Sequence, residues 1–239
     1  MALIEKLSAI GDAIREKTGK EDLLTLEQMP LEIASIETGG CEDFLAQRIT
    51  NTLVSYENND IREIAINAFN NCISLVSIKC ANVESLKANA FINATSLETA
   101  EFPSLTYIEY GVFRNCSKLK ELIFKNPIKY PAGGWAEIFN GCTAIKKIDF
   151  KSIDTFGNHY SPFGNTKSLE ALIIRNTDAI CNLPQNNAFG GSAIASGTGY
   201  IYVPAALIEE YKAATNWVTF AEQFRAIEDY PEICGEVAQ

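Results

Sequence analysis

The sequence predicts a repeat solenoid in which stacked repeats each contribute one short strand to a parallel β-sheet. The first observation is a phrase that recurs six times, an aromatic residue followed by small polar residues. It begins at Phe69, Phe91, Phe113, Phe139, Phe163 and Phe189. The second observation is the spacing, with steps of 22, 22, 26, 24 and 26 residues. Self-similarity at such a period is typical of proteins whose repeats contact only their neighbours.

A common template supports this fold class. Apolar residues recur nine and eleven positions after each leading Phe, and two such positions share one face of a strand. The ninth positions hold Ile78, Ala100, Leu122, Ile148 and Leu172, and the eleventh hold Cys80, Phe102, Phe124, Phe150 and Ile174. We expect both sets to face the core, beside a stack of the leading phenylalanines. Asn71, Asn93 and Asn115 suit turns in which the side chain bonds nearby backbone.

The wording of the repeat resembles the BspA-like class of leucine-rich repeats, A-F-x-N-C-x-x-L-x-x-I with an aliphatic residue several positions before each Phe. Ile64, Leu86 and Ile108 fill that preceding position. The resemblance covers residues 60–204 and implies a non-catalytic scaffold that presents a binding surface. The later repeats depart from the pattern, with an insertion around residues 126–135 and an altered stretch at residues 195–199.

The first 40 residues predict a small helical N-terminal module. Apolar positions fall at helical spacing, Pro30 marks the start of a second short helix, and Gly39-Gly40 forms a joint. The apolar stripe must dock somewhere, so the module either caps the array or attaches and oligomerises the protein. The runs at residues 10–19 and 24–30 look like a segment of bacteriophage and prophage tail-associated proteins of Gram-positive bacteria. That resemblance implies contacts with other tail proteins, or a homo-oligomer, through residues 1–40.

Residues 41–204 are expected to form the array with its N-terminal cap, and residues 205–239 a helical C-terminal cap and tail. Tyr200 to Pro204 reads as the final strand, followed by a helix that begins at Ala205. A second apolar stripe consists of Phe220, Phe224 and Ile227. We expect residues Cys234 to Gln239 to form a frayed tail. Such a cap would cover the last repeat and block edge-to-edge growth.

Charge and hydropathy narrow the possible partners. The formal net charge of -10 and the pI near 4.7 argue against nucleic acid, whose phosphates would repel the chain. No apolar run approaches the roughly 20 residues that span a bilayer, so we expect no membrane insertion. The first residues lack the pattern of a secretory signal, and synthesis in the bacterial cytoplasm is expected.

Cysteines and the single histidine argue against catalysis and metal binding. Seven cysteines are an odd number that favours free thiols, and Cys72, Cys116 and Cys142 share one repeat position as buried fillers. No pair of cysteines has the C-x-x-C spacing of a zinc site. A triad would have to be built around His159. We therefore expect no enzyme activity, no metal and no cofactor.

Two groups of residues are candidate binding sites. Positions ten and twelve after each Phe should face outward, and at position twelve Lys125, Lys151 and Arg175 form a basic ladder on an acidic protein. The ladder is either solvated strand charge or a site for an anion, such as a phosphate-bearing cell-wall glycan. The outward tenth positions are Lys79, Glu101, Ile123, Asp149 and Ile173. The second group consists of aromatic residues and a histidine in the irregular repeats, which could stack on sugar rings. Its members are Tyr130, Trp135, His159 and Tyr160.

These observations favour a non-catalytic virion tail fibre or tip component that presents the array to a host cell. The partner would be a bacterial cell-surface glycan or protein, bound by several copies at once. The alternative is a BspA-like adhesin at the bacterial cell surface, or a general protein interaction module. A cytoplasmic scaffold is a third interpretation that leaves the N-terminal resemblance unexplained.

Overall fold

A computed structural model describes residues 47–48, 50–131, 137–157 and 161–235. The chain divides into two compact units, residues 1–53 and 54–239. In the first unit, the backbone N–H of Thr52 donates to the carbonyl of Gln47 at 2.8 Å. The predicted helical module of residues 1–40 lies outside the described residues. The second unit carries the repeats, and its fold is the predicted parallel β-solenoid.

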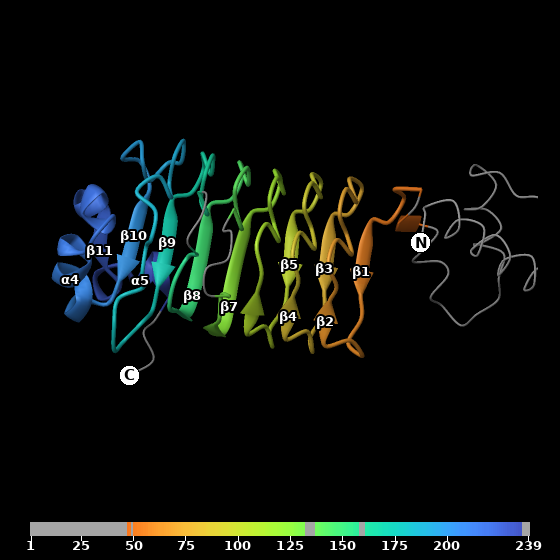
Figure 1. Ribbon diagram of the computed structural model, residues 1–239, viewed down its shortest axis with the longest axis horizontal. Helices are drawn as coiled ribbons and strands as arrows, with labels where there is room; N and C mark the ends of the chain where they lie inside the picture. Colours follow the sequence, from red (N-terminus) through yellow and green to blue (C-terminus); the bar gives the residue numbers. More distant parts are fainter. Residues whose placement is uncertain (1–46, 49, 132–136, 158–160, 236–239) are drawn as a thin grey trace, which may run out of the picture. The chain divides into compact units, whose positions relative to one another are not determined.

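One wall of the solenoid is built from parallel strands that follow one another in chain order (Figure 1). They are β1 (Ser55–Glu57), β3 (Ser77–Lys79) and β5 (Thr99–Glu101), then β7 (Glu121–Ile128), β8 (Lys147–Ile153), β9 (Ala171–Ile174), β10 (Tyr200–Val203) and β11 (Phe224–Ala226). The first three form one sheet and the last five another. The backbone N–H of Lys120 donates to the carbonyl of Glu98 across the junction between them.

A second wall carries a strand that the sequence template did not include. Its three parallel strands are β2 (Glu63–Ile64), β4 (Ser85–Leu86) and β6 (Tyr107–Ile108). Ile64, Leu86 and Ile108, the aliphatic residues before each Phe, lie in these strands and are buried. The early repeats therefore contribute two strands each, and the expectation of one was too low. Such strands are too short for an alternating pattern to reveal.

The leading phenylalanines form the predicted stack inside the coil. Consecutive rings lie 5.1, 5.4, 6.2, 5.6 and 4.8 Å apart between centroids, from Phe69 to Phe189, with interplanar angles between 5° and 17°. All six rings are buried, and each contributes about 1.5–3 kcal/mol of apolar burial. Tyr56 of β1 tilts against Phe69 at one end, and Phe189 meets Phe220 at the other.

The turn after each Phe depends on a left-handed backbone position. The residue two places after Phe has φ between 58° and 78° in every repeat: Asn71, Asn93, Asn115, Gly141, Asn165 and Gly191. Asparagine and glycine are the residues that adopt this conformation at least cost. The side chains do not bond nearby backbone as expected. The Asn93 amide donates to Asn71 Oδ1 at 3.0 Å, and the Asn115 amide donates to Asn93 Oδ1 at 2.8 Å. They form an amide ladder between repeats.

The cysteines at the next position are buried and free, as predicted. The thiols of Cys116 and Cys142 donate to the carbonyls of Phe91 and Phe113 in the preceding repeat. Burial raises the pKa of Cys142 to about 12 and holds the pKa of Cys116 well above its usual value. These thiols pack as small apolar side chains with a weak hydrogen-bond donor.

The enlarged fourth repeat is accommodated by a longer strand. β7 pairs in register with β8 up to Phe124 and again from Pro127, with a register shift between them. Beyond β7, Lys129 forms a bridge with Tyr107, so this segment reaches the wall of β6. Phe156 in the following repeat is fully buried in the core.

The C-terminal cap combines short helices with one more strand. Its elements are η1 (Ala205–Leu207), α4 (Ile208–Ala213), η2 (Trp217–Gln223), β11, η3 (Ile227–Asp229) and α5 (Pro231–Cys234). Trp217 is buried against Phe189 and donates its indole N–H to the carbonyl of Cys181 at 2.7 Å. Tyr200–Val203 is not the final strand, because β11 pairs with β10 in parallel. Cys234, expected to begin a frayed tail, is buried at the end of α5.

Two substitutions of Asn93 separate the contribution of the amide hydrogen bonds from that of the left-handed backbone conformation. We expect Asn93→Ala to destabilise the protein by about 2 kcal/mol. The change removes two hydrogen bonds, and alanine adopts a backbone φ near 60° less readily than asparagine does. Asn93→Gly loses the same hydrogen bonds but accepts the backbone conformation, so it should be about 1 kcal/mol milder. Urea unfolding of the two variants measures the difference. An alanine variant as stable as the glycine variant would contradict the assignment.

Candidate binding surface

The outer face of the main wall, which points away from the phenylalanine stack, is open over its first strands. Lys79 and Glu101 are exposed there, and Ile123 on β7 has 48% of its surface exposed. Asp149 and Ile173 pair in register with Ile123 on the next two strands. Both were expected to be exposed, yet Asp149 is only 6% exposed and Ile173 is fully buried. The second half of the outer face is therefore covered.

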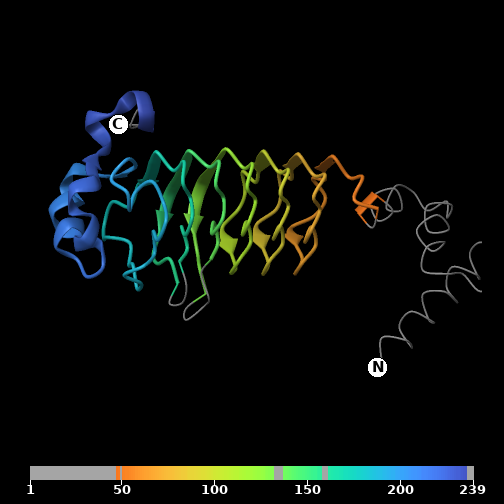
Figure 2. The same cartoon turned by 90° about the horizontal axis from the view of Figure 1, so that it is seen from above.

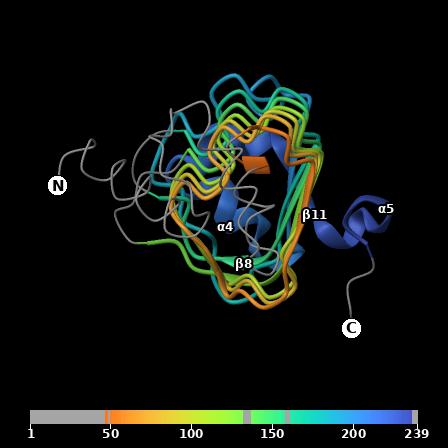
Figure 3. The ribbon, with the colours of Figure 1, turned by 90° about the vertical axis from the view of Figure 1, so that its right-hand side faces the viewer.

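The cover is the segment of residues 230–234, Tyr230 and α5, which we call the strap. Figures 2 and 3 show α5 outside the coil, beside the strands of the main wall. Cys234 joins a small buried cluster with Ala171, Ile173 and Tyr202 of β9 and β10, and Ile233 packs against that cluster. Because this cluster lies outside the coil, it is separate from the phenylalanine stack.

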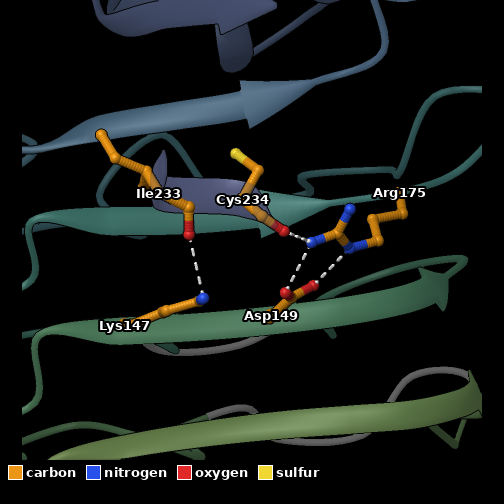
Figure 4. Close-up of polar contacts among 5 residues, drawn as sticks. All are labelled: Lys147, Asp149, Arg175, Ile233 and Cys234. Carbon is orange, nitrogen blue, oxygen red and sulfur yellow. Dashed lines mark hydrogen bonds and ion pairs between the residues drawn. The ribbon is translucent and has the colours of Figure 1, made fainter. Parts of the chain in front are cut away.

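Two cations of the main wall hold the end of the strap (Figure 4). Arg175 pairs with Asp149 through Nε to Oδ1 at 2.8 Å and Nη2 to Oδ2 at 2.9 Å. Nη2 of Arg175 also donates to the carbonyl of Cys234, and Lys147 Nζ donates to the carbonyl of Ile233 at 3.0 Å. The last carbonyls of a helix lack partners within it, so cations there satisfy them.

The electrostatics of this contact follow from its partial burial. The hydrogen bonds to the Asp149 carboxylate raise the pKa of Arg175, which therefore stays charged. Burial raises the pKa of the Cys234 thiol to about 11. The strap thus contacts an ion pair in which Arg175 and Asp149 neutralise each other. Its own thiol, Cys234, stays protonated near neutral pH.

The predicted basic ladder is not a row of three equivalent free charges. Arg175 is committed to Asp149 and to the strap, whereas Lys125 and Lys151 are exposed. Within the described residues, the side chain of neither lysine makes a hydrogen bond or ion pair. An anion at this edge would have two lysines available, and binding of an anion there stays a prediction.

Of the four predicted sugar-stacking residues, Tyr130 lies among the described residues. Tyr130 is only 9% exposed, against the expectation of an exposed ring, and burial raises the pKa of its hydroxyl. Trp135, His159 and Tyr160 lie outside the described residues. Among the residues that are described, no three His, Cys, Asp or Glu side chains gather as metal ligands would. The described helices are all too short or too polar to cross a membrane.

A groove that sequence reasoning did not identify lies on the open half of the outer face. It has a volume of about 520 Å³ over β5, β7 and the start of β8. Ile123 and Pro103 contribute exposed apolar surface, and lysines and glutamates surround them. Lys120 pairs with Glu98 and Lys79 with Glu101, so part of the rim is internally neutralised. The available signal was a large aliphatic residue, Ile123, at an outward strand position.

Comparisons with known proteins agree with this architecture. The family described as BspA type Leucine rich repeat region matches residues 45–170 in six copies. The crystal structure of the pneumococcal vaccine antigen PcpA is similar, with 23% identity, a TM-score of 0.52, and 72% of this chain aligned to 39% of that chain. The chain thus spans well under half the length of that antigen. None of the curated proteins matches the sequence.

A leucine-rich repeat protein of T. pallidum also aligns, with 20% identity and a TM-score of 0.49 over 63% of this chain and 69% of that one. At these identities the structural likeness concerns the fold alone. Leucine-rich repeat solenoids are typically non-catalytic binding scaffolds, and the family match indicates no enzyme.

The partly buried ion pair under the strap should show strong coupling. We expect Asp149→Ala and Arg175→Ala each to destabilise the protein, and the double variant to be less destabilised than their sum by about 1–3 kcal/mol, because each single change leaves a charge without its partner. Urea unfolding of the four proteins gives the coupling energy. The exposed pair Lys79–Glu101 is the matched control, with coupling below about 0.5 kcal/mol. Equal coupling in both cycles would refute the role of burial.

Proposed function

The chain belongs to the BspA-type leucine-rich repeat family, and on that premise we propose that it is a non-catalytic, adhesin-like binding protein. The groove on the open half of the outer face carries the contact. Its partner is a protein at a cell surface, engaged through a short apolar segment.

The observation that carries this proposal is Ile123. A large aliphatic side chain that is 48% exposed on a strand has no role in the core of the coil. It lies in a groove of about 520 Å³, a size that accommodates a few side chains of a partner. Exposed apolar surface with a charged rim is the usual composition of a protein interface.

Charge favours a partner with carboxylates. Lys125 borders the groove, and Lys151 follows at the equivalent position of the next strand. Both are exposed, and neither is neutralised by a described residue. On a chain of net charge -10, two such lysines direct an acidic segment toward this edge. A phosphate-bearing glycan shares that charge but does not account for Ile123.

The groove is tested by a charge placed on its floor. We expect Ile123→Asp to weaken binding of fluorescently labelled protein to Gram-positive bacterial cells by roughly tenfold or more, because the carboxylate must be desolvated against the partner. Val218→Asp is the matched control, since Val218 is 55% exposed on the C-terminal cap. Flow cytometry over a concentration series measures both. Equal binding by the two variants would place the contact elsewhere.

The chemical class of the partner is tested on the cells. Trypsin treatment should abolish binding if the partner is a protein, whereas periodate treatment should abolish it if the partner is a glycan. Lys125→Glu combined with Lys151→Glu should weaken binding and remove most of its salt dependence, since these lysines supply the free positive charge. Binding that survives trypsin and is lost after periodate would replace the protein partner with a glycan.

A virion tail component is a second candidate, favoured by the resemblance of residues 2–37 to phage tail-associated proteins. In that setting residues 1–40 would contact other tail proteins or a second copy of the chain, and the virion would present the same groove to its host. Tail genes beside this gene, together with a multimeric mass of the full chain in light scattering, would favour this candidate over an adhesin.

A further inference from the structure

One residue belongs to both the groove and the strap contact. Lys147, the first residue of β8, lines the groove and donates to the carbonyl of Ile233 at 3.0 Å. A carboxylate that enters the groove from a partner meets the same ammonium group. Because a charged acceptor makes a stronger hydrogen bond than a peptide carbonyl, the two compete for Lys147.

The strap resembles a bound peptide more than a part of the core. It is five residues long, and only one end of it is connected to the array through described residues. Its contacts with the wall are the cluster around Ile173 and Tyr202, the ring of Tyr230 at 5.5 Å from Tyr202, and the two hydrogen bonds to its terminal carbonyls. Segments with few buried contacts open more readily than core strands.

The strap also shows which chemistry this face accepts. Tyr230 and Ile233 pack on the wall, whereas Glu232 and the two carboxylates just before the strap, Glu228 and Asp229, are exposed. The receiving wall presents Ile173 and Tyr202, the ion pair of Arg175 with Asp149, and Lys147, and both cations bind backbone carbonyls of the strap. The open groove continues the same wall with the same chemistry, Ile123 beside Lys125 and Lys147.

We propose that the outer face over β7–β10 is a receptor for short apolar peptide segments, that the strap fills its second half in cis, and that a partner segment with a carboxylate for Lys147 displaces the strap. Displacement uncovers Ile173 and Tyr202, which then add a second apolar patch on the far side of the Asp149–Arg175 ion pair from Ile123. The link to partner binding rests on the proposed function of the groove. The receptor property of the covered half does not.

Tethering sets the concentration at which a free peptide can compete. A segment joined to its site by a short linker has an effective concentration in the millimolar range, so a free peptide must approach roughly 1 mM to displace it. A partner that also fills the groove gains a second contact and needs less. The strap therefore acts as a threshold that favours partners able to bind both halves of the face.

The test uses the full chain and a synthetic peptide with the sequence of residues 227–235 carrying Cys234→Ser. The readout is the rate at which a thiol reagent labels Cys234 at pH 8, located by mass spectrometry. We expect Ile233→Ser in the protein to speed labelling by roughly tenfold, because the strap loses apolar burial. The fluorescent peptide should bind this variant at least roughly tenfold more tightly than it binds the wild type, since the tethered competitor is weakened.

Val218→Ser is the matched control, the same kind of change at an exposed apolar residue away from the wall, and should alter neither rate nor binding. A peptide with Tyr230→Ser and Ile233→Ser should not bind. Unchanged labelling of Cys234 in the Ile233→Ser protein would overturn displacement of the strap. Faster labelling without peptide binding up to a few millimolar, the range set by tethering, would overturn the receptor.

Hydrogen exchange of the wild type keeps the proposal testable if Ile233→Ser fails to fold. The amides of Ile233 and Cys234 should exchange at least roughly a hundredfold faster than that of Ile173 in β9, as expected for a segment that opens locally. Equal rates would overturn the proposal. Cell binding tests the proposed function separately. If the wild-type protein does not bind cells but the peptide still displaces the strap, the proposed function is wrong and the receptor proposal stands.

Discussion

The fold depends on one constraint, that the chain must reverse direction at the same place in every turn of the coil. The residue two positions after each leading Phe meets this constraint with a left-handed backbone conformation. Its N–H then donates along the array, from Asn71 to the carbonyl of Ile92 and from Asn93 to that of Arg114. Register between repeats is thereby set at the turn. The phenylalanine stack and the inward strand residues pack in the order that this register imposes.

The same register explains why the last repeats differ from the first. An array that simply ended would expose its stack and a strand edge. Phe189, the final ring, is instead covered by Trp217 and Phe220 of the cap. β11 then extends the sheet by one strand and directs the chain back across the outer face. The cap and the strap are successive parts of one path, and the outer face is half covered because the array had to be closed.

Features that repeat could be predicted from the sequence, and features that occur once could not. The phenylalanine stack, the buried cysteines and the inward strand positions recur at fixed spacing, so the period reveals them. β2, β4 and β6 recur too, but two residues are too few to show alternation. The role of Arg175 was inaccessible, because its contact with Cys234 spans 59 positions and involves a backbone carbonyl. The sequence predicted that Ile123 faces outward, but it did not predict the groove in which Ile123 lies.

The buried thiols have a consequence for where such a protein can operate. Oxidation and disulfide exchange proceed through the thiolate, and they need access to the sulfur. The five described cysteines of the array, as distinct from Cys234 in the strap, are all buried, and burial raises the pKa of most of them. Sulfur atoms sealed in this way are slow to react even with an oxidant present. The described repeats can therefore face an oxidising medium without cross-linking through these five cysteines.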